Sequence, residues 1–279
     1  MKIRWETERG WTEFKSPYVL KRNDGLGVGE VVINMERSPF QDGAFLTGTY
    51  FEPRHIEFEI IILGNNSQQA ERRRQLLKVF NPKLEGTLIV TDDNNNNYTI
   101  TGRAEEIVFP SEVGDSTSPS HQVALISIVA PDPFFKGQEY TLVLGAFIGG
   151  WQFPFKFPLQ WGTMAKFRDI NNDGDVPAPL FIELVGELEN VLIENQTTGE
   201  KIHLDVLIED GERIEIDTEA KTVIKIDNLG NRTNAFPFLT IDSTLFSLAV
   251  GENVINYSAD VEGSNARVII AYKKRYIGI

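Results

Sequence analysis

The sequence contains no cysteine, and this absence excludes disulfide bonds, thiolate metal sites and cysteine nucleophiles. It also lacks any apolar run that approaches the roughly 18 residues needed to span a bilayer as a helix. Residues 1–6 contain no apolar core of signal-peptide length. We therefore expect a soluble protein that is made in a cytoplasm and has no membrane partner.

Basic residues are scarce relative to acidic ones. The chain has 27 Lys and Arg against 40 Asp and Glu, which gives a net charge of −13. Tight binding to a nucleic-acid backbone needs clustered Lys and Arg, so we expect no specific nucleic-acid binding. A length of 279 residues with 41% hydrophobic and 10% aromatic content is sufficient for two domains with their own cores.

Two loops resemble ligand-binding motifs only in part. Residues 25–30 look like a dinucleotide fingerprint, but Glu30 stands where glycine or alanine is required and a strand pattern follows, so we expect a flexible turn. Residues 169–174 match the first half of a calcium loop. Pro177 and Leu180 then occupy its ninth and twelfth positions, which favours an ordinary acidic turn, although cation binding at 169–175 stays open.

The sequence shows no set of catalytic or metal-binding residues. His55, His121 and His203 lie in no metal-ligand spacing, and no nucleophile elbow, phosphate loop or zinc-protease motif is present. A triad or carboxylate pair formed from distant positions stays open. We expect no enzyme activity, no cofactor and no metal. The run Arg72 to Arg74 fans around a helix, so we interpret it as a solvated face or a subunit interface.

Strand patterns dominate the chain, with apolar residues at alternate positions between turn residues. The predicted strands are 31–35, 56–62, 86–91, 98–108, 123–130, 180–185, 191–194, 202–207, 214–217, 222–226, 254–257 and 267–272. The run of Asp and Asn at 92–97 tolerates positive φ, and it predicts a hairpin loop between two of these strands.

One segment, residues 67–80, consists of strong helix formers and predicts a helix. Ser67 is the expected N-cap, and the Asn-Pro pair at 81–82 ends the segment. The expected apolar stripe consists of Ala70, Leu76, Leu77 and Phe80. We therefore predict a short helix that lies on a sheet.

The predicted strand at 123–130 ends abruptly. The residues that follow it are Pro131, Asp132, Pro133, Phe134 and Phe135. Each proline removes a backbone donor and fixes φ, and the preceding residue is restricted to extended geometry. We predict that this segment is a stiff domain junction anchored by its phenylalanines. The predicted domains are residues 1–138 and 139–279.

An aromatic ladder follows the junction. Its alternating members are Trp151, Phe153, Phe155 and Phe157. Interleaved prolines favour an edge strand whose aromatic face closes a core, and this interpretation is favoured over a stacking surface for sugars. Trp151 and Trp161 are the candidate residues for sugar or partner contact.

Four parts of the chain, in order, resemble the distal tail protein (Dit) family of long-tailed siphophages. These are 54–86 with its paired leucines before Asn-Pro, 98–109 with its Gly-Arg step, 130–135, and 173–200 with 211–217 beyond. The resemblance implies a mainly β fold, with an N-terminal β-rich ring-forming domain that has one α-helix and a long hairpin. It implies a C-terminal galectin-like antiparallel β-sandwich.

The resemblance also implies a structural function in the virion tail tip. Family members form hexameric rings that act as a hub between the tail tube protein and the tail-associated protein, and they can contact tape-measure and receptor-binding proteins. An acidic lumen that lets DNA slide would explain the net charge. The alternative is a carbohydrate-binding β-sandwich protein that acts on the host cell wall, and a wall hydrolase ranks third.

Overall fold

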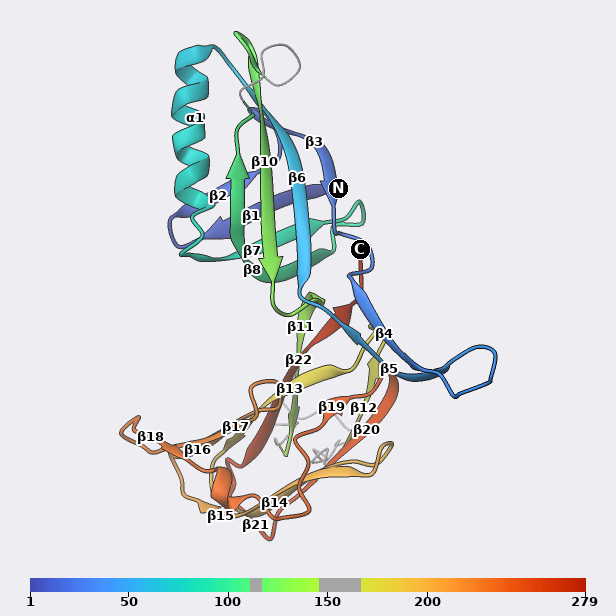
Figure 1. Ribbon diagram of the computed structural model, residues 1–279. Helices are drawn as coiled ribbons and strands as arrows, with labels where there is room; N and C mark the ends of the chain where they lie inside the picture. The colour runs from blue at the N-terminus through green and yellow to red at the C-terminus, as the bar shows by residue number, and fades with distance from the viewer. Residues whose placement is uncertain (111–116, 146–166) are drawn as a thin grey trace, which may run out of the picture. The chain divides into compact units, whose positions relative to one another are not determined.

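The computed structural model describes residues 1–110, 117–145 and 167–279 (Figure 1). They form two compact units. Unit 1 comprises Met1–Gln138 together with Tyr276–Ile279, and unit 2 comprises Glu139–Arg275. The last four residues therefore lie with unit 1, and the chain connects the two units at two points.

Unit 1 is built mainly from antiparallel strands. Its elements are β1 (Lys2–Thr7), β2 (Gly10–Glu13), β3 (Tyr18–Asp24), β4 (Val31–Glu36), β5 (Phe45–Phe51), β6 (Arg54–Leu63), α1 (Asn66–Val79), β7 (Glu85–Thr91), β8 (Asn97–Val108), β9 (Thr117–Ser118) and β10 (His121–Ala130). β11 (Phe135–Leu144) begins in unit 1 and ends in unit 2.

The main sheet of unit 1 follows the order β2-β1-β7-β8-β10-β6-β3, and each neighbouring pair is antiparallel. β6 shows why these residues form a strand: the side chains at positions 54, 56, 58, 60 and 62 are buried, and those between them are more exposed. The predicted hairpin loop at 92–97 is confirmed, since β7 and β8 pair from Glu85↔Arg103 to Thr91↔Asn97. β4 and β5 form a separate two-stranded sheet.

The predicted helix is confirmed, but its start and its packing face differ from the prediction. The N-cap is Asn65 rather than Ser67, because the Asn65 side chain accepts the N–H of Gln68 while the Gln68 side chain accepts the N–H of Asn65. The helix is only weakly amphipathic and packs through Leu76 and Val79. Ala70 is exposed and Leu77 is 50% exposed, so the expected stripe was wrong at these two positions.

The core of unit 1 is rich in aromatic side chains. The Trp5 and Phe80 rings stack with centroids 5.6 Å apart, and Phe14 packs on both Phe80 and Phe58. Gly86 lies directly over Trp5, and a Cβ at that position would come within 2.3 Å of the indole ring. The glycine is therefore required for this stack, because a larger residue would push the tryptophan out of the core.

Unit 2 is also antiparallel. Its elements are β12 (Phe167–Asn172), β13 (Ala178–Val185), β14 (Leu188–Asn195), β15 (Glu200–Ile208), β16 (Arg213–Asp217), β17 (Thr222–Ile226), β18 (Arg232–Asn234), the 3₁₀ helix η1 (Phe236–Phe238), β19 (Ser247–Leu248), β20 (Gly251–Ser258), β21 (Val261–Glu262) and β22 (Arg267–Tyr276). One sheet has the order β18-β17-β16-β13-β22, and the other has β12-β20-β14-β15.

The two sheets of unit 2 share one core. Ile182 of β13 and Val268 of β22 belong to the same buried cluster as Ile193 of β14, Ile202 of β15 and Ile255 of β20. Two antiparallel sheets that enclose one apolar core form a β-sandwich. The mainly β fold predicted from the sequence is confirmed. All of the predicted strands exist. Their observed ends lie within three residues of the predicted ends, except that β22 continues to Tyr276 instead of ending at residue 272.

Some sequence expectations fall on residues that are not described. The aromatic ladder from Trp151 to Phe157, and Trp161, lie in the undescribed range 146–166. Within the described ranges, no helix has both the length and the apolar character needed to cross a bilayer.

Candidate functional site

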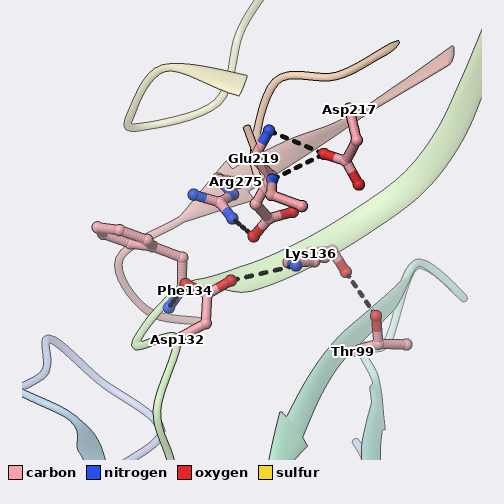
Figure 2. Close-up of polar contacts among 8 residues, drawn as sticks. Thr99, Asp132, Phe134, Lys136, Asp217, Glu219 and Arg275 are labelled. Atoms are coloured by element: carbon pink, nitrogen blue, oxygen red, sulfur yellow. Dashed lines mark hydrogen bonds and ion pairs between the residues drawn. The ribbon is translucent and has the colours of Figure 1, made fainter. Parts of the chain in front are cut away.

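Four of the predicted junction residues, Pro131 to Phe134, form the turn between β10 and β11 inside unit 1, and Phe135 is the first residue of β11. A carboxylate oxygen of Asp132 accepts the N–H of Phe134 at 3.3 Å. The same side chain pairs with Nζ of Lys136 at 3.1 Å, and the Lys136 carbonyl accepts the hydroxyl of Thr99 on β8 (Figure 2). These contacts stabilise the conformation of the turn and connect the start of β11 to β8. The role of the turn as a stiff junction between domains remains a prediction.

The two phenylalanines of this turn have different environments. Phe135 is fully buried and belongs to the core of unit 1. Phe134 is half-buried, and its ring meets that of Phe51 edge to face with centroids 5.2 Å apart. Phe51 is the last residue of β5, so Phe134 connects the turn to the end of the β4–β5 hairpin.

Arg54 is the centre of a polar cluster in unit 1. Its side chain is 1% exposed, and its guanidinium lies over the Phe135 ring at 4.8 Å from the centroid. Nε donates to the carbonyl of Pro133 at 2.6 Å, Nη1 to those of Gly25 at 2.8 Å and Gly27 at 2.5 Å. A fourth bond runs from Nη2 to the carbonyl of Ile277 at 2.6 Å. Burial lowers the pKa of Arg54.

The Arg54 cluster was not predicted from the sequence, although one signal was available. Arg54 occupies the same face of β6 as Ile56, Phe58, Ile60 and Ile62, which is the buried face. A guanidinium at an inward position of an alternating strand must be satisfied by hydrogen bonds, because an unpaired buried charge is strongly unfavourable. The alternation therefore indicated a structural arginine.

The loop before β4 forms one side of this cluster. The expected turn at 25–30 is present, and Gly25 adopts φ +82°, where a Cβ would lie 2.1 Å from the carbonyl oxygen of His55. Leu26 is 7% exposed, and its carbonyl accepts the N–H of Ile279 at 3.0 Å. The turn is therefore held in place, whereas a flexible one was expected.

The β4–β5 hairpin carries an apolar surface. Figure 1 shows it as a ribbon that stands apart from the main sheet of unit 1. Large apolar side chains that are at least 50% exposed are found on both strands and at the tip: Ile33, Met35, Phe40, Phe45, Leu46 and Tyr50. The register pairs Met35 with Leu46, whereas Phe45 lies opposite Glu36, so apolar side chains are exposed on both faces of the hairpin. Large apolar side chains gathered in this way on one exposed element are typical of an interaction site.

The acidic loop after β12 is held by structural contacts. Asn172 is fully buried, and its amide donates to the carbonyls of Val176 and Leu248, each at 3.2 Å. The carboxylate of Asp173 pairs with the ammonium of Lys274, which lowers the pKa of Asp173. No group of three or more His, Cys, Asp and Glu side chains that could hold a metal ion occurs in the described parts of the chain.

The remaining polar candidates are dispersed. His55 lies 3.7 Å from a carboxylate oxygen of Glu105 on the surface of the sheet, His121 bonds Ser118 at 2.8 Å, and His203 is on β15 in unit 2. His55 and His121 thus belong to unit 1, and His203 belongs to unit 2. Arg72 donates to the carbonyl of Leu63.

Unit 2 has two further ion pairs of note. Near the end of β22, Arg275 pairs with Glu219, whose own N–H is accepted by Asp217 at 2.8 Å (Figure 2). Elsewhere, Nζ of Lys201 lies 2.5 Å from a carboxylate oxygen of Asp242. The hydrogen bond from Lys201, with a second from a threonine hydroxyl, lowers the pKa of Asp242 to about 2.

Comparisons with known proteins agree with this architecture. A family model described as a siphovirus-type tail component, C-terminal domain, matches residues 173–276. A second, described as a phage tail protein RIFT-related domain, matches residues 12–112. A search of curated protein sequences found no match.

Solved structures share the fold over nearly the whole chain. The crystal structure of the Dit protein of phage SPP1, described as a paradigm of the hub adsorption apparatus in phages that infect Gram-positive bacteria, aligns with a TM-score of 0.71 at 13% identity and covers 98% of both chains. A chain of the phage P2 baseplate in its activated conformation with Ca aligns with a TM-score of 0.53 at 12% identity over 97% of both chains. The same baseplate with Sr gives 0.51 at 12% identity over the same shares.

A β-rich unit with one helix, followed by a β-sandwich and matched by two tail-protein models, defines a structural component of a phage tail. The chain belongs to the siphophage distal tail protein (Dit) family, as its sequence resemblance indicated. Its role is structural, in the distal part of the virion tail.

Proposed function

We propose that this chain assembles into a closed hexameric ring of identical subunits, which forms the hub at the tail tip. Unit 1 makes the ring and contacts the tail tube protein, while the tail-associated protein binds the opposite side. Tape-measure and receptor-binding proteins are further partners. The observation that carries the proposal is the exposed apolar β4–β5 hairpin.

A hairpin of this kind is poorly suited to a free monomer. β4 and β5 pair only with each other among the described strands, and an isolated two-stranded hairpin is marginally stable in water. Packing its apolar side chains against another surface removes them from water, which contributes about 25 cal/mol per Å² buried. A neighbouring subunit offers such a surface at every position in the assembly.

The geometry of such a contact favours a ring. The hairpin of one subunit binds a different surface of the next, which is a head-to-tail contact. Head-to-tail contacts either close into rings or extend as filaments, depending on the rotation per subunit. The SPP1 Dit protein is described as a hub, and this supports closure into a ring.

The test is the oligomeric state of hairpin variants. Phe45→Glu with Leu46→Glu places charges on the exposed hairpin surface, and Ile241→Glu is the matched control at a fully exposed isoleucine in unit 2. Native mass spectrometry and negative-stain imaging should show rings for the wild type and the control, and single subunits for the hairpin variant. Rings from the hairpin variant, or no ring from the wild type in the presence of tail tube protein, would contradict the proposal.

An acidic sheet face supports the idea that unit 1 lines a channel for DNA. Glu57 on β6 and Glu105 and Glu106 on β8 are exposed side chains of the main sheet. Glu59 also lies on this sheet but pairs with Lys21 at 2.6 Å. We propose that this face borders the lumen, where like charge keeps the DNA backbone from adhering.

Charge reversal tests the acidic face. Rings of the double variant Glu57→Lys with Glu106→Lys should retain DNA in a salt-dependent manner, whereas wild-type rings should not. Asp205→Lys with Glu252→Lys is the control, since both residues are exposed in unit 2. Equal retention by both double variants would show that the effect is not specific to this face.

A hub role needs no catalysis, and we propose that the protein has no enzyme activity and is made in the cytoplasm of the bacterial host. The alternative of sugar binding depends on Trp151 and Trp161, which lie outside the described residues. It stays a prediction, and loss of binding to wall fragments on Trp151→Ala would support it. The galectin-like character of unit 2 also stays a prediction. A galectin-like fold would not by itself imply sugar binding, because fold and site are separate claims.

A further inference from the structure

Both ends of the β4–β5 hairpin meet at Arg54. The outgoing strand β4 begins at Val31, shortly after Gly25 and Gly27, whose carbonyls both accept from Nη1 of Arg54. The returning strand β5 ends at Phe51, three residues before Arg54 itself. One guanidinium therefore holds the start of the hairpin against its end.

The base of the hairpin is closed by two further contacts. The N–H of Glu52 donates to the carbonyl of Glu30 at 3.0 Å, which extends the pairing of the two strands toward the core. The Phe51 ring packs edge to face on Phe134. The Arg54 bond to Pro133 reaches the same turn, so the hairpin base and the turn after β10 are connected by a hydrogen bond and by a ring contact.

The C-terminal residues of unit 1 complete the cluster. The carbonyl of Ile277 accepts from Arg54, and the N–H of Ile279 donates to Leu26. Gly278 lies against the backbone of Gly27, where a Cβ would come within 2.7 Å of the Gly27 carbonyl carbon. The loop that leads into β4 is therefore enclosed between Arg54 and residues 277–279.

We propose that Arg54 is a positioning residue that fixes the direction in which the β4–β5 hairpin leaves unit 1. The planar guanidinium donates several hydrogen bonds in a fixed fork, so it can hold four carbonyls in one arrangement. A lysine at this position has one compact ammonium and cannot reproduce that fork. The functional value of the fixed direction rests on the proposed ring, because head-to-tail contacts close into a ring only when the hairpin leaves every subunit in the same direction.

The absence of cysteine makes a direct measurement possible. Spin labels at Asp42→Cys, in the loop between β4 and β5, and at Glu71→Cys, on α1, report the distance from the hairpin to the body of unit 1. Double electron–electron resonance is recorded on dilute subunits, so the result does not depend on ring formation. The labelled wild type should give a narrow distance distribution.

The variant Arg54→Met should broaden this distribution at least twofold, and Arg54→Lys should broaden it by a smaller factor. Arg22→Met is the matched control, because Arg22 is exposed on β3 and pairs with Asp24 at 3.7 Å. The control should keep the wild-type width. Equal widths for Arg54→Met and Arg22→Met, with both proteins folded by circular dichroism, would overturn the proposal. A broad wild-type distribution would overturn it as well.

A second variant covers the case in which Arg54→Met does not fold. Gly278→Ala leaves Arg54 intact and displaces the C-terminal residues from Gly27. It should broaden the distribution and increase amide exchange at Leu26 to Glu30. An unchanged width in folded Gly278→Ala would refute the proposal. If the wild type gives a narrow distribution and forms no ring, the proposed function fails while the positioning role of Arg54 stands.

Discussion

The adjacent phenylalanines 134 and 135 allow one residue type to be tested in two environments. Phe135 is fully buried in the core of unit 1, whereas Phe134 is half-buried against Phe51. Phe135→Ala should lower the free energy of unfolding of unit 1 by about 3–5 kcal/mol, the range for removing a buried aromatic ring. Phe134→Ala should lower it by about 1 kcal/mol, since it loses mainly one edge-to-face contact.

The assay must separate the two units, because a chain with two cores is not bound to unfold in one step. Hydrogen exchange in increasing urea, read by mass spectrometry, follows peptides from β6 and β10 for unit 1 and from β13 and β14 for unit 2. With a urea dependence of about 2 kcal/mol per M, Phe135→Ala should shift the midpoint of unit 1 by roughly 2 M. Phe134→Ala should shift it by roughly 0.5 M.

Two results would refute this reasoning. Equal shifts for the two variants would mean that burial does not determine how strongly each ring anchors the turn. A shift confined to the peptides of unit 2 would mean that Phe135 does not belong to the core in which the structure places it.

Three further predictions concern unit 2. Asn172→Ala should lower the free energy of unfolding by about 3 kcal/mol, because it leaves buried backbone groups without their hydrogen-bond partner. Asn171→Ala, at the exposed neighbouring position, should change the free energy of unfolding little, and urea denaturation measures both variants. Ca²⁺ at about 1 mM should not change the melting temperature, since the Asp173 carboxylate is already in an ion pair, and a rise of several degrees would revive the calcium interpretation. The Asp242 carboxyl should titrate near pH 2 by NMR. Because its pKa is lowered in the folded state, its contribution to stability is present above the unfolded pKa and is lost as the pH falls through about 2. A titration midpoint near pH 4 would exclude the ion pair in solution.

The sequence predicted the strands of this fold well because most of them have one buried face. Alternation of apolar and polar residues marks β6, β13 and β20 without ambiguity. Among the strands that were missed, β3 and β11 bury little: most of their side chains are exposed or half-exposed, so no period of two is visible. β1 and β12 were also missed, although each buries alternate side chains over part of its length. A strand at the edge of a sheet, or one that runs from one unit into the other, is identified from the strands that it pairs with and not from the pattern of its own residues.

The helix shows how local rules can compete. Asn65 and Ser67 are both good N-cap residues, and the choice between them depends on which residue lies three positions later. Gln68 completes a capping box with Asn65, and this pattern was readable in the sequence. The packing face could not be predicted in the same way, because only part of α1 contacts the sheet and exposed Leu77 mimics a core position.

The candidate site was predictable only in part. The turn from Pro131 to Phe135 was identified from its prolines, but its partner Arg54 lies far away in sequence, and Ile277 lies farther still. Backbone carbonyls are present at every residue, so no motif indicates which of them an arginine will bind. The apolar hairpin surface was likewise not predicted from the residues, since β5 lacks clear alternation.

The return of Tyr276–Ile279 to unit 1 has a consequence for biosynthesis. The hydrogen bond from Arg54 to Ile277 joins residues 223 positions apart, with all of unit 2 between them in the chain. A nascent subunit emerging from the ribosome can fold most of unit 1 early. The hydrogen bond from Arg54 to Ile277 at the base of the hairpin can form only after unit 2 has been translated. Under the proposed ring assembly, we therefore expect only subunits whose synthesis has reached residue 277 to present the hairpin in a fixed direction. Incomplete chains would then be excluded from the ring.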